Sequence, residues 1–261
     1  MISFPNIDPV ILKIGHLSVR WYGMMYIIGF ASSYLLIRYQ MKKKGFNSGK
    51  AFVDTLYSYI ILGLLIGARL GYVFFYNRSY YIRHPFEIFA LWYGGMSFHG
   101  GLIGSIIAGI IVCRKFKIDF WQIADIVVVT APIGLGLGRL GNFINGELYG
   151  RITNVPWAMV FPAGGPYPRH PSQVYEFLLE GASLFVILWF LKDRKLKPGI
   201  LSSLFLILYG SFRFFVEFFR EPDPQLGFIL GLFTMGQILS AVMITLGVGL
   251  LFYKSKQWRA P

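Results

Sequence analysis

Long apolar runs dominate the pattern of hydrophobic and polar positions along this chain of 261 residues. Most of the runs are about 18–25 residues long, the length at which a helix crosses roughly 30 Å of hydrocarbon. Strands of a membrane barrel would instead show about 10 residues of alternating pattern. The sequence therefore predicts an all-α polytopic membrane protein with about seven transmembrane helices, over residues 21–37, 56–76, 94–113, 121–143, 174–191, 199–219 and 229–253.

The composition agrees with a membrane protein and excludes an ordinary soluble globular domain. Hydrophobic residues make up 55% of the chain, and charged residues only 14%. Pro5, Asp8 and Pro9 precede the first apolar run, a pattern that is not typical of a cleaved signal peptide. We expect residues 1–261 to form a single integral membrane domain, with the lipid bilayer as its surroundings.

The distribution of lysine and arginine predicts the orientation. One alternating set of connections holds 15 of the 25 basic residues, and the other set holds seven. Because basic residues accumulate in cytoplasmic loops, this bias places the N-terminus outside and the C-terminus in the cytoplasm. The net charge of +13 then reflects topology and attraction to anionic lipid. It does not indicate a nucleic-acid partner, since the basic residues are divided among short loops.

The longer connections are predicted on the outer face, at about 1–20, 77–93 and 144–173. The last of these contains five prolines, which are incompatible with a continuous helix. We expect these loops to form a small cap outside the membrane, where functional residues are often found. Inside the spans, glycines four residues apart, as in Gly63-Gly67-Gly71 and Gly100-Gly104, predict close packing between helices.

Cysteine and histidine usage argues against a metal or a disulfide. Cys113 is the single cysteine of the chain, and the four histidines show no metal-ligand spacing. We therefore expect neither a structural metal nor a disulfide within the chain.

Charged and polar residues inside the apolar runs are the most informative feature. A central arginine in a membrane helix costs roughly 2.5–3.5 kcal/mol, so such residues are usually functional or paired. On the predicted topology they converge near the outer leaflet from several spans: Tyr26, Arg69, His99, Arg139, Asn142, Asn145, Glu147, Glu176, Glu180, Arg213 and Glu217.

Two interpretations of this convergence are open. Arg213 with Glu217, and Arg139 with Glu147 or Glu176, could be structural ion pairs that fix helix register. His99 could be a packing histidine, and Tyr26 an interface anchor. However, more polar groups share this depth than simple pairing requires. Two arginines there suit a phosphate-bearing lipid, because a guanidinium matches phosphate oxygens bidentately.

Four motifs carry a family resemblance. HGGLIG at 99–104, GRLGNFINGELYGR at 138–151, RHPSQVYE at 169–176 and YGSFRFFVEFFRE at 209–221 resemble the bacterial phosphatidylglycerol–prolipoprotein diacylglyceryl transferases. The resemblance extends over the whole chain in order and span count. It implies transfer of a diacylglyceryl group from phosphatidylglycerol to the lipobox cysteine thiol of a prolipoprotein, with release of glycerol phosphate. It further implies a multi-pass protein of the bacterial inner membrane, acting at the outer leaflet as the first step of lipoprotein maturation, without metal or organic cofactor.

The resemblance and the residues together suggest roles for the site. Arg139 and Arg213 would bind the headgroup and stabilise the departing phosphate. Because an unperturbed thiol is mostly protonated at neutral pH, a base is needed; His99 is the preferred candidate and Tyr26 the alternative. The remaining residues would shape the headgroup pocket (Asn142, Asn145, Glu147, Arg151) or support the site (Gly100, Gly101, His170, Glu176, Glu217).

A competing hypothesis is a transporter for a lipid or a small anion at the outer leaflet. Alternating access would favour a site near the middle of the membrane, often between repeated halves. The polar residues of this chain are concentrated in the outer half instead, and no internal repeat is evident.

Overall fold

The computed structural model describes residues 2–256 except 6, 16, 47–48, 91, 93, 223–227 and 230–232. Parts of the predicted outer loops 1–20 and 77–93 therefore lie outside the described residues. The contacts divide the chain into two compact units, Met1–Leu36 with Ala124–Pro261 and Ile37–Ile123. We call these the first and the second unit and describe each by itself.

Each of the seven predicted apolar runs contains a long helical segment. In chain order these are α1 (Trp21–Lys43), α2 (Gly49–Phe75), α4 (Phe98–Phe116), α5 (Phe120–Ile144), a continuous helical segment over Ser172–Leu191, α8 (Ile200–Val216) and α9 (Met235–Lys256). Five of them, α2, α4, α5, the 172–191 segment and α9, are long and apolar enough to cross a membrane. The polytopic helical class is thus confirmed, whereas the number of spans and their orientation stay predictions.

The connections add small elements that the apolar pattern did not predict. Strands β1 (Val10–Ile14) and β2 (Leu17–Arg20) form an antiparallel hairpin within the predicted outer loop 1–20. Strands β3 (Phe228–Ile229) and β4 (Phe233–Thr234) form a second pair, so that α9 begins six residues later than the apolar run at 229. Both pairs are strand additions to a fold that is otherwise helical.

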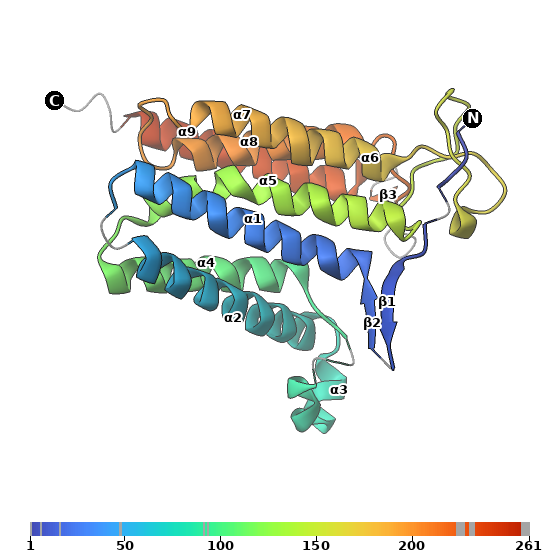
Figure 1. Cartoon of the computed structure of the whole chain (residues 1–261), viewed down its shortest axis with the longest axis horizontal. Helices are drawn as coiled ribbons and strands as arrows, with labels where there is room; N and C mark the ends of the chain where they lie inside the picture. The colour runs from blue at the N-terminus through green and yellow to red at the C-terminus, as the bar shows by residue number, and fades with distance from the viewer. Residues whose placement is uncertain are drawn as a thin grey trace. The chain divides into compact units, whose positions relative to one another are not determined.

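In the first unit, α5, α7 (Leu184–Leu191), α8 and α9 run alongside one another (Figure 1). α5, α7 and α8 share a core that contains Val129, Leu184, Leu188 and Leu201, all nearly or fully buried. Asp125 of α5 fixes the start of α8, because its carboxylate accepts hydrogen bonds from the Gly199 and Ser202 amides, both at 2.8 Å, and from the Ser202 hydroxyl at 2.7 Å. A buried carboxylate at a helix N-terminus satisfies free amides and complements the helix dipole.

The segment 172–191 changes its helical form along its length. Residues Ser172–Glu176 form α6, Phe177–Ser183 form the π-helix η4, and α7 follows. At the wide turn, Gly181 lies against Gly136 of α5 so closely that an added Cβ would be 2.7 Å from the Gly136 Cα. The π-helix occurs where side chains of the candidate site lie on this segment, as described below, and such turns often mark functional sites.

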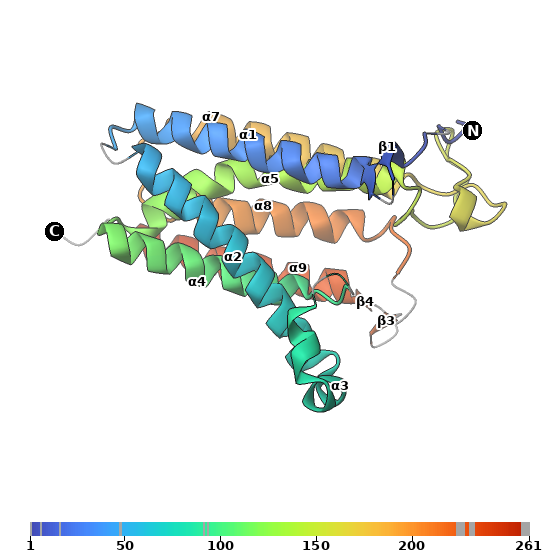
Figure 2. The same ribbon diagram turned by 60° about the horizontal axis from the view of Figure 1, so that its bottom comes forward.

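In the second unit, α2 and α4 lie side by side (Figure 2). Gly67 of α2 faces Gly100 and Gly104 of α4, and a Cβ on Gly67 would overlap the Gly100 carbonyl oxygen. The predicted close packing of these glycine patterns is therefore confirmed. Helices α3 (Arg78–Arg83) and the 3₁₀ turn η1 (Pro85–Phe89) follow in the connection between them.

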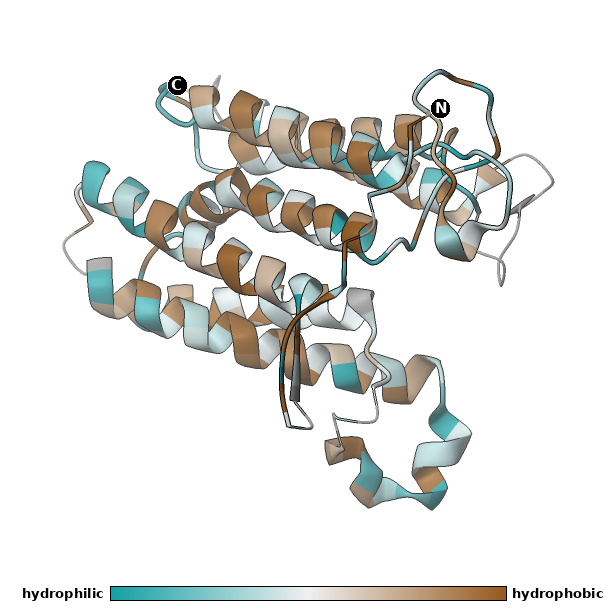
Figure 3. Cartoon of the chain, turned by 45° about the vertical axis from the view of Figure 1, so that its right-hand side comes forward, coloured by the Kyte–Doolittle hydropathy of each residue, from teal (hydrophilic) through white to brown (hydrophobic). Residues whose placement is uncertain are grey.

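Hydrophobic residues make up much of the long helices in each unit (Figure 3). Leu62, Ile66, Phe190 and Leu246, for example, are 56%, 57%, 75% and 62% exposed. Exposed apolar residues on this scale are typical of a surface that faces lipid.

Candidate functional site

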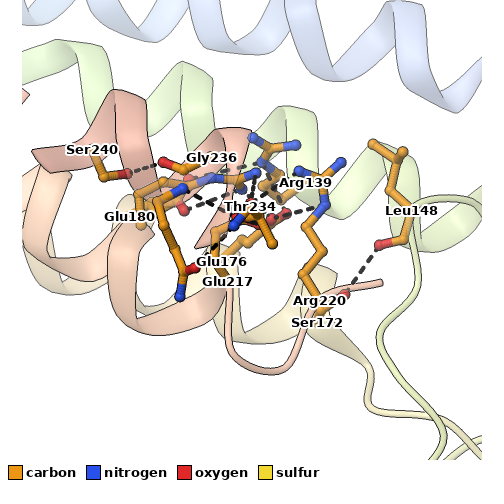
Figure 4. Close-up of polar contacts among 12 residues, drawn as sticks. Arg139, Leu148, Ser172, Glu176, Glu180, Glu217, Arg220, Thr234, Gly236 and Ser240 are labelled. Atoms are coloured by element: carbon orange, nitrogen blue, oxygen red, sulfur yellow. Dashed lines mark hydrogen bonds and ion pairs between the residues drawn. The ribbon is translucent and has the colours of Figure 1, made fainter. Parts of the chain in front are cut away.

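Three arginines and three glutamates meet within the first unit, and we call them the arginine–glutamate cluster: Arg139, Glu176, Glu180, Arg213, Glu217 and Arg220 (Figure 4). They come from α5, from the helical segment 172–191, and from α8 with the turn that follows it. The predicted convergence of Arg139, Glu176, Arg213 and Glu217 is therefore present in the structure.

Glu176 joins the two arginines that were predicted to bind a headgroup. Its Oε2 lies 3.1 Å from Arg139 Nε, and its Oε1 accepts a hydrogen bond from Arg213 Nη1. Because the two arginines are on different helices, this single carboxylate holds α5 and α8 together and brings both guanidinium groups to one place.

Glu217 completes the other side of Arg213. Its Oε1 accepts hydrogen bonds from Arg213 Nη2 and, at 3.3 Å, from Arg220 Nη1. Its Oε2 accepts one from the Thr234 hydroxyl at 2.8 Å, next to the start of α9. The sequence spacing of four residues between Arg213 and Glu217 predicted this pair correctly.

The cluster is buried. The side chains of Glu176 and Glu180 are fully buried, and those of Arg213 and Arg139 are 12% and 21% exposed. Buried ionised groups require partners of opposite charge, and the cluster supplies three of each sign. Most of the remaining exposure belongs to the arginine side chains, so they are the part of the cluster that a ligand could reach.

The motif after α5 folds back on itself. Asn142 and Asn145 each donate a side-chain hydrogen bond to Glu147 Oε1, at 2.9 and 3.1 Å, and Gln173 donates to the Glu147 carbonyl at 2.6 Å. Glu147 thus binds the two asparagines. The ion pairs of Arg139 are with Glu176 and Glu180, and a pair Arg139–Glu147 is not among the ion pairs of the described residues. Gly146, at φ +67°, makes the turn possible.

Arg151 reaches the end of α8. Its Nε donates to the Arg220 carbonyl at 2.9 Å and its Nη2 to the Glu217 carbonyl at 3.3 Å. The neighbouring Gly150 lies so close to the Phe219 carbonyl that no side chain would fit there. These contacts place Arg151 where it supports the backbone around Glu217 and Arg220. Its predicted contact with a headgroup stays a prediction.

His170 belongs to a chain of hydrogen bonds at the start of α6. Trp157 Nε1 donates to the Tyr175 hydroxyl at 2.6 Å, and this hydroxyl is 3.0 Å from His170 Nδ1. Since an indole only donates, the Tyr175 hydroxyl accepts from it, and its own proton is available for His170 Nδ1. Burial lowers the pKa of His170 below its usual range. These observations agree with a supporting, neutral histidine.

Tyr26 of α1 lies beside α5, near Gly138, the residue that precedes Arg139. Its hydroxyl is 3.1 Å from that of Tyr22, and a Cβ on Gly138 would be 4.0 Å from the Tyr26 hydroxyl. Gly141 makes room for the Tyr22 ring in the same way. Tyr26 is 46% exposed. The two tyrosines therefore line α5 on either side of the Arg139 position.

His99, Gly100 and Gly101 belong to the second unit, at the first turn of α4. His99 is exposed, and the Ser97 hydroxyl caps this turn by accepting from the Gly100 amide at 3.2 Å. Gly100 is required for the approach of α2, as described above. The role of His99 as a base stays a prediction.

Arg69 has a structural role within the second unit. It is 3% exposed and donates hydrogen bonds to five backbone carbonyls, those of Glu87, Ile88, Ala90, Gly94 and Gly95. It therefore holds the connection between η1 and α4 in place.

The sequence predicted Glu180 at the depth of the site but no role for it, and predicted no part in the site for Arg220, Gln173 or Tyr22. Glu180 follows Glu176 by four residues, and Arg220 follows Glu217 by three, so helical spacing was the available signal. Arg220 lies in the connection after α8 and belongs to the cluster.

An apolar groove of about 410 Å³ lies on the first unit, between α8 and α9. It is lined by Phe214, Phe233, Gln237, Ala241, Val242 and Leu246, among others. Gln237 connects the groove to the cluster, because its Oε1 accepts from the Thr234 amide while Thr234 donates to Glu217. The described residues contain no group of three metal-ligating side chains.

Comparison with known proteins gives one consistent family. The family model for prolipoprotein diacylglyceryl transferase matches residues 9–253. A phosphatidylglycerol–prolipoprotein diacylglyceryl transferase of Desulfotalea psychrophila is 54% identical, over 98% of this chain and 96% of the relative. Proteins of the same name from Geobacter sulfurreducens and Bordetella avium are 52% and 49% identical, over 99% and 98% of this chain and 100% and 98% of the relatives. The chain therefore belongs to the prolipoprotein diacylglyceryl transferase family.

Proposed function

We propose that this protein transfers the diacylglyceryl group of phosphatidylglycerol to the cysteine thiol of a prolipoprotein and releases glycerol phosphate. The observation that carries the proposal is the shared buried carboxylate of Glu176, which holds Arg139 and Arg213 from two helices at one place. Two guanidinium groups at one point suit the phosphate of the lipid. The relatives compared here are named transferases, which gives no support to a transporter.

The chemistry divides between the lipid and the peptide. The substrate thiol attacks the glycerol carbon, an S–C bond forms, and the C–O bond to the phosphate breaks with its electron pair remaining on the phosphate oxygen. Arg139 and Arg213 would bind the headgroup and stabilise this added negative charge. The thiol proton would pass to His99, with Tyr26 as the alternative base.

The other residues of the motif would complete the headgroup pocket. Glu147, fixed by Asn142 and Asn145, has acceptor oxygens suited to the glycerol hydroxyls of phosphatidylglycerol. The apolar groove between α8 and α9 would accept part of an acyl chain.

We further propose that the single domain crosses the bacterial inner membrane seven times, with the N-terminus outside. The five long apolar helices and the bias of basic residues support this arrangement. The cluster would then lie toward the outer leaflet, where the lipobox of a prolipoprotein arrives.

The decisive experiment is a lipidation assay with phosphatidylglycerol and a lipobox peptide. Arg139→Ala is expected to abolish transfer, whereas Arg194→Ala, the same change in an exposed loop of the same unit, retains it. Membrane insertion is measured for both variants. Full activity of Arg139→Ala would refute the headgroup role.

A second variant tests the source of the nucleophile. Cys113 is buried in α4, and the proposed nucleophile belongs to the peptide. Cys113→Ser is expected to keep wild-type transfer. A large loss of activity with normal protein levels would mean that the enzyme supplies the thiol.

A further inference from the structure

Glu180 differs from the other carboxylates of the cluster in its contacts. Its side chain is fully buried in the π-helix η4, and neither carboxylate oxygen has a hydrogen-bond donor among the described residues. Its nearest cationic atoms are Arg213 Nη1 at 3.6 Å and Arg139 Nε at 3.9 Å. Glu176 and Glu217, in contrast, both accept hydrogen bonds from Arg213. Glu180 is thus the weakest-held carboxylate of the cluster.

The charge balance of the cluster gives this difference a consequence. With all groups ionised, three arginines and three glutamates sum to zero. A phosphodiester would add one negative charge to a buried site that is otherwise neutral. Burying a charge without a compensating partner is unfavourable. Removing one negative charge from the cluster would offset that of the phosphate.

The groups that face Glu180 point to it as the carboxylate that gives up its charge. They are Arg139 of α5, Glu176 of α6, and Arg213 and Tyr209 of α8. The two arginines are the ones proposed to bind the phosphate, and Glu176 repels a second ionised carboxylate beside it. When the arginines turn toward a phosphate, Glu180 loses its only cationic partners among the described residues.

We propose that Glu180 takes up one proton from solvent when the phosphate of a phosphatidylglycerol headgroup binds to Arg139 and Arg213. The inference rests on the proposed function, because it takes the lipid phosphate as the ligand. Protonation keeps the net charge of the cluster and its ligand at zero and releases both guanidinium groups from Glu180. Glu180 is then a positioning residue that acts through the arginines.

The direct test is calorimetric titration of the purified protein, in a neutral detergent, with short-chain phosphatidylglycerol. Titrations at about pH 8 in two buffers of different ionisation enthalpy give the number of protons taken up. Wild type is expected to take up close to one proton, and Glu180→Gln close to none while it still binds. Glu221→Gln is the matched control, since Glu221 is exposed and pairs with Arg169 outside the cluster; it should keep the wild-type uptake.

The pH dependence of the affinity gives a second, linked result. Uptake of one proton makes the Kd of wild type rise about ten-fold per pH unit on the alkaline side, whereas the Kd of Glu180→Gln should stay flat. A wild-type protein that binds the lipid without proton uptake would overturn the inference, as would unchanged uptake in Glu180→Gln. Failure of wild type to bind the lipid would instead count against the proposed function.

A measurement on the wild-type protein alone covers the case in which Glu180→Gln fails to fold. An infrared difference spectrum should gain a protonated-carboxyl band when the lipid binds. Absence of that band, with binding established by calorimetry, would also overturn the inference.

Discussion

Arg213→Ala tests how the arginine–glutamate cluster is held together. Arg213 contacts three carboxylates, those of Glu176, Glu180 and Glu217. After removal of this side chain, Glu176 keeps its ion pair with Arg139 at 3.1 Å, and Glu217 keeps its ion pair with Arg220 at 3.3 Å. Glu180 keeps only the 3.9 Å contact with Arg139. Breaking a buried ion pair by removing one partner costs about 3–5 kcal/mol. We expect Arg213→Ala to lower the free energy of unfolding by an amount in this range.

Arg139→Ala is the matched comparison within the same cluster. Glu176 then keeps its hydrogen bond from Arg213, and Glu180 keeps Arg213 at 3.6 Å. The loss is therefore closer to that of one hydrogen bond between charged groups, about 1.5–3 kcal/mol. We expect Arg213→Ala to be the more destabilising of the two variants by about 1.5–2 kcal/mol, the difference between these ranges.

A double variant identifies the cause of the difference. The loss of stability in Arg213→Ala is attributed to an excess of negative charge. Adding Glu180→Gln tests this, because it removes the charge of the carboxylate with the weakest remaining contact. Residues of one ion-pair network couple by about 0.5–3 kcal/mol, so the double variant should regain about 1 kcal/mol or more.

The assay is unfolding by sodium dodecyl sulfate in mixed micelles at about pH 8, followed by far-ultraviolet circular dichroism. Wild type, both single variants, Glu180→Gln and the double variant are compared under one set of conditions. Equal losses for Arg213→Ala and Arg139→Ala would refute the argument from remaining partners. A double variant less stable than Arg213→Ala would refute the argument from excess charge.

Three further predictions use the same unfolding assay. Gly67→Ala should lower the free energy of unfolding by about 1–3 kcal/mol, because the new Cβ overlaps the backbone of α4. The control Gly109→Ala should cost nothing, because its Cβ would be 3.7 Å from its nearest neighbour. Equal losses for the two variants would contradict the packing argument. Asp125→Asn should cost about 1.5–3 kcal/mol, because an amide cannot accept all three hydrogen bonds at the start of α8; a loss near zero would contradict this. His170 has a lowered pKa, so the folded state disfavours its protonation, and wild-type stability should fall as the pH drops through about 6.5. His170→Gln should show a smaller fall, and an unchanged pH profile would contradict the assignment.

The helices could be predicted because length and hydrophobicity determine them. A run of about 20 apolar residues has few structures available other than a helix, and each of the seven runs contains a long helical segment. The ends of the helices were less predictable. Residues 229 and 233–234 are apolar enough to extend α9, yet they pair as strands, because hydropathy does not distinguish a short apolar strand from a helix end.

The site was predicted from depth and periodicity, and its errors follow from what these leave out. Depth brought Arg139, Glu176 and Arg213 together correctly. Membrane depth could not determine the direction of the chain after α5, where Gly146 has a φ of 67° and Leu148 a φ of 58°. That turn directs Glu147 to the asparagines, and no spacing rule for regular helices describes it.

The cluster must satisfy two opposing requirements if it binds a phosphate. Without a ligand, buried arginines need anionic partners, which Glu176 and Glu217 supply through hydrogen bonds. The same partners compete with a phosphate for the guanidinium groups, so carboxylates that held the arginines too firmly would exclude it. A carboxylate at 3.6–3.9 Å that can become neutral resolves this conflict, because its attraction exists only while the site is empty. Glu176→Gln removes the charge of a hydrogen-bonded carboxylate, so the side chains of Arg139 and Arg213 should change position. Glu180→Gln should leave their positions unchanged. Crystal structures of the two variants would distinguish these outcomes.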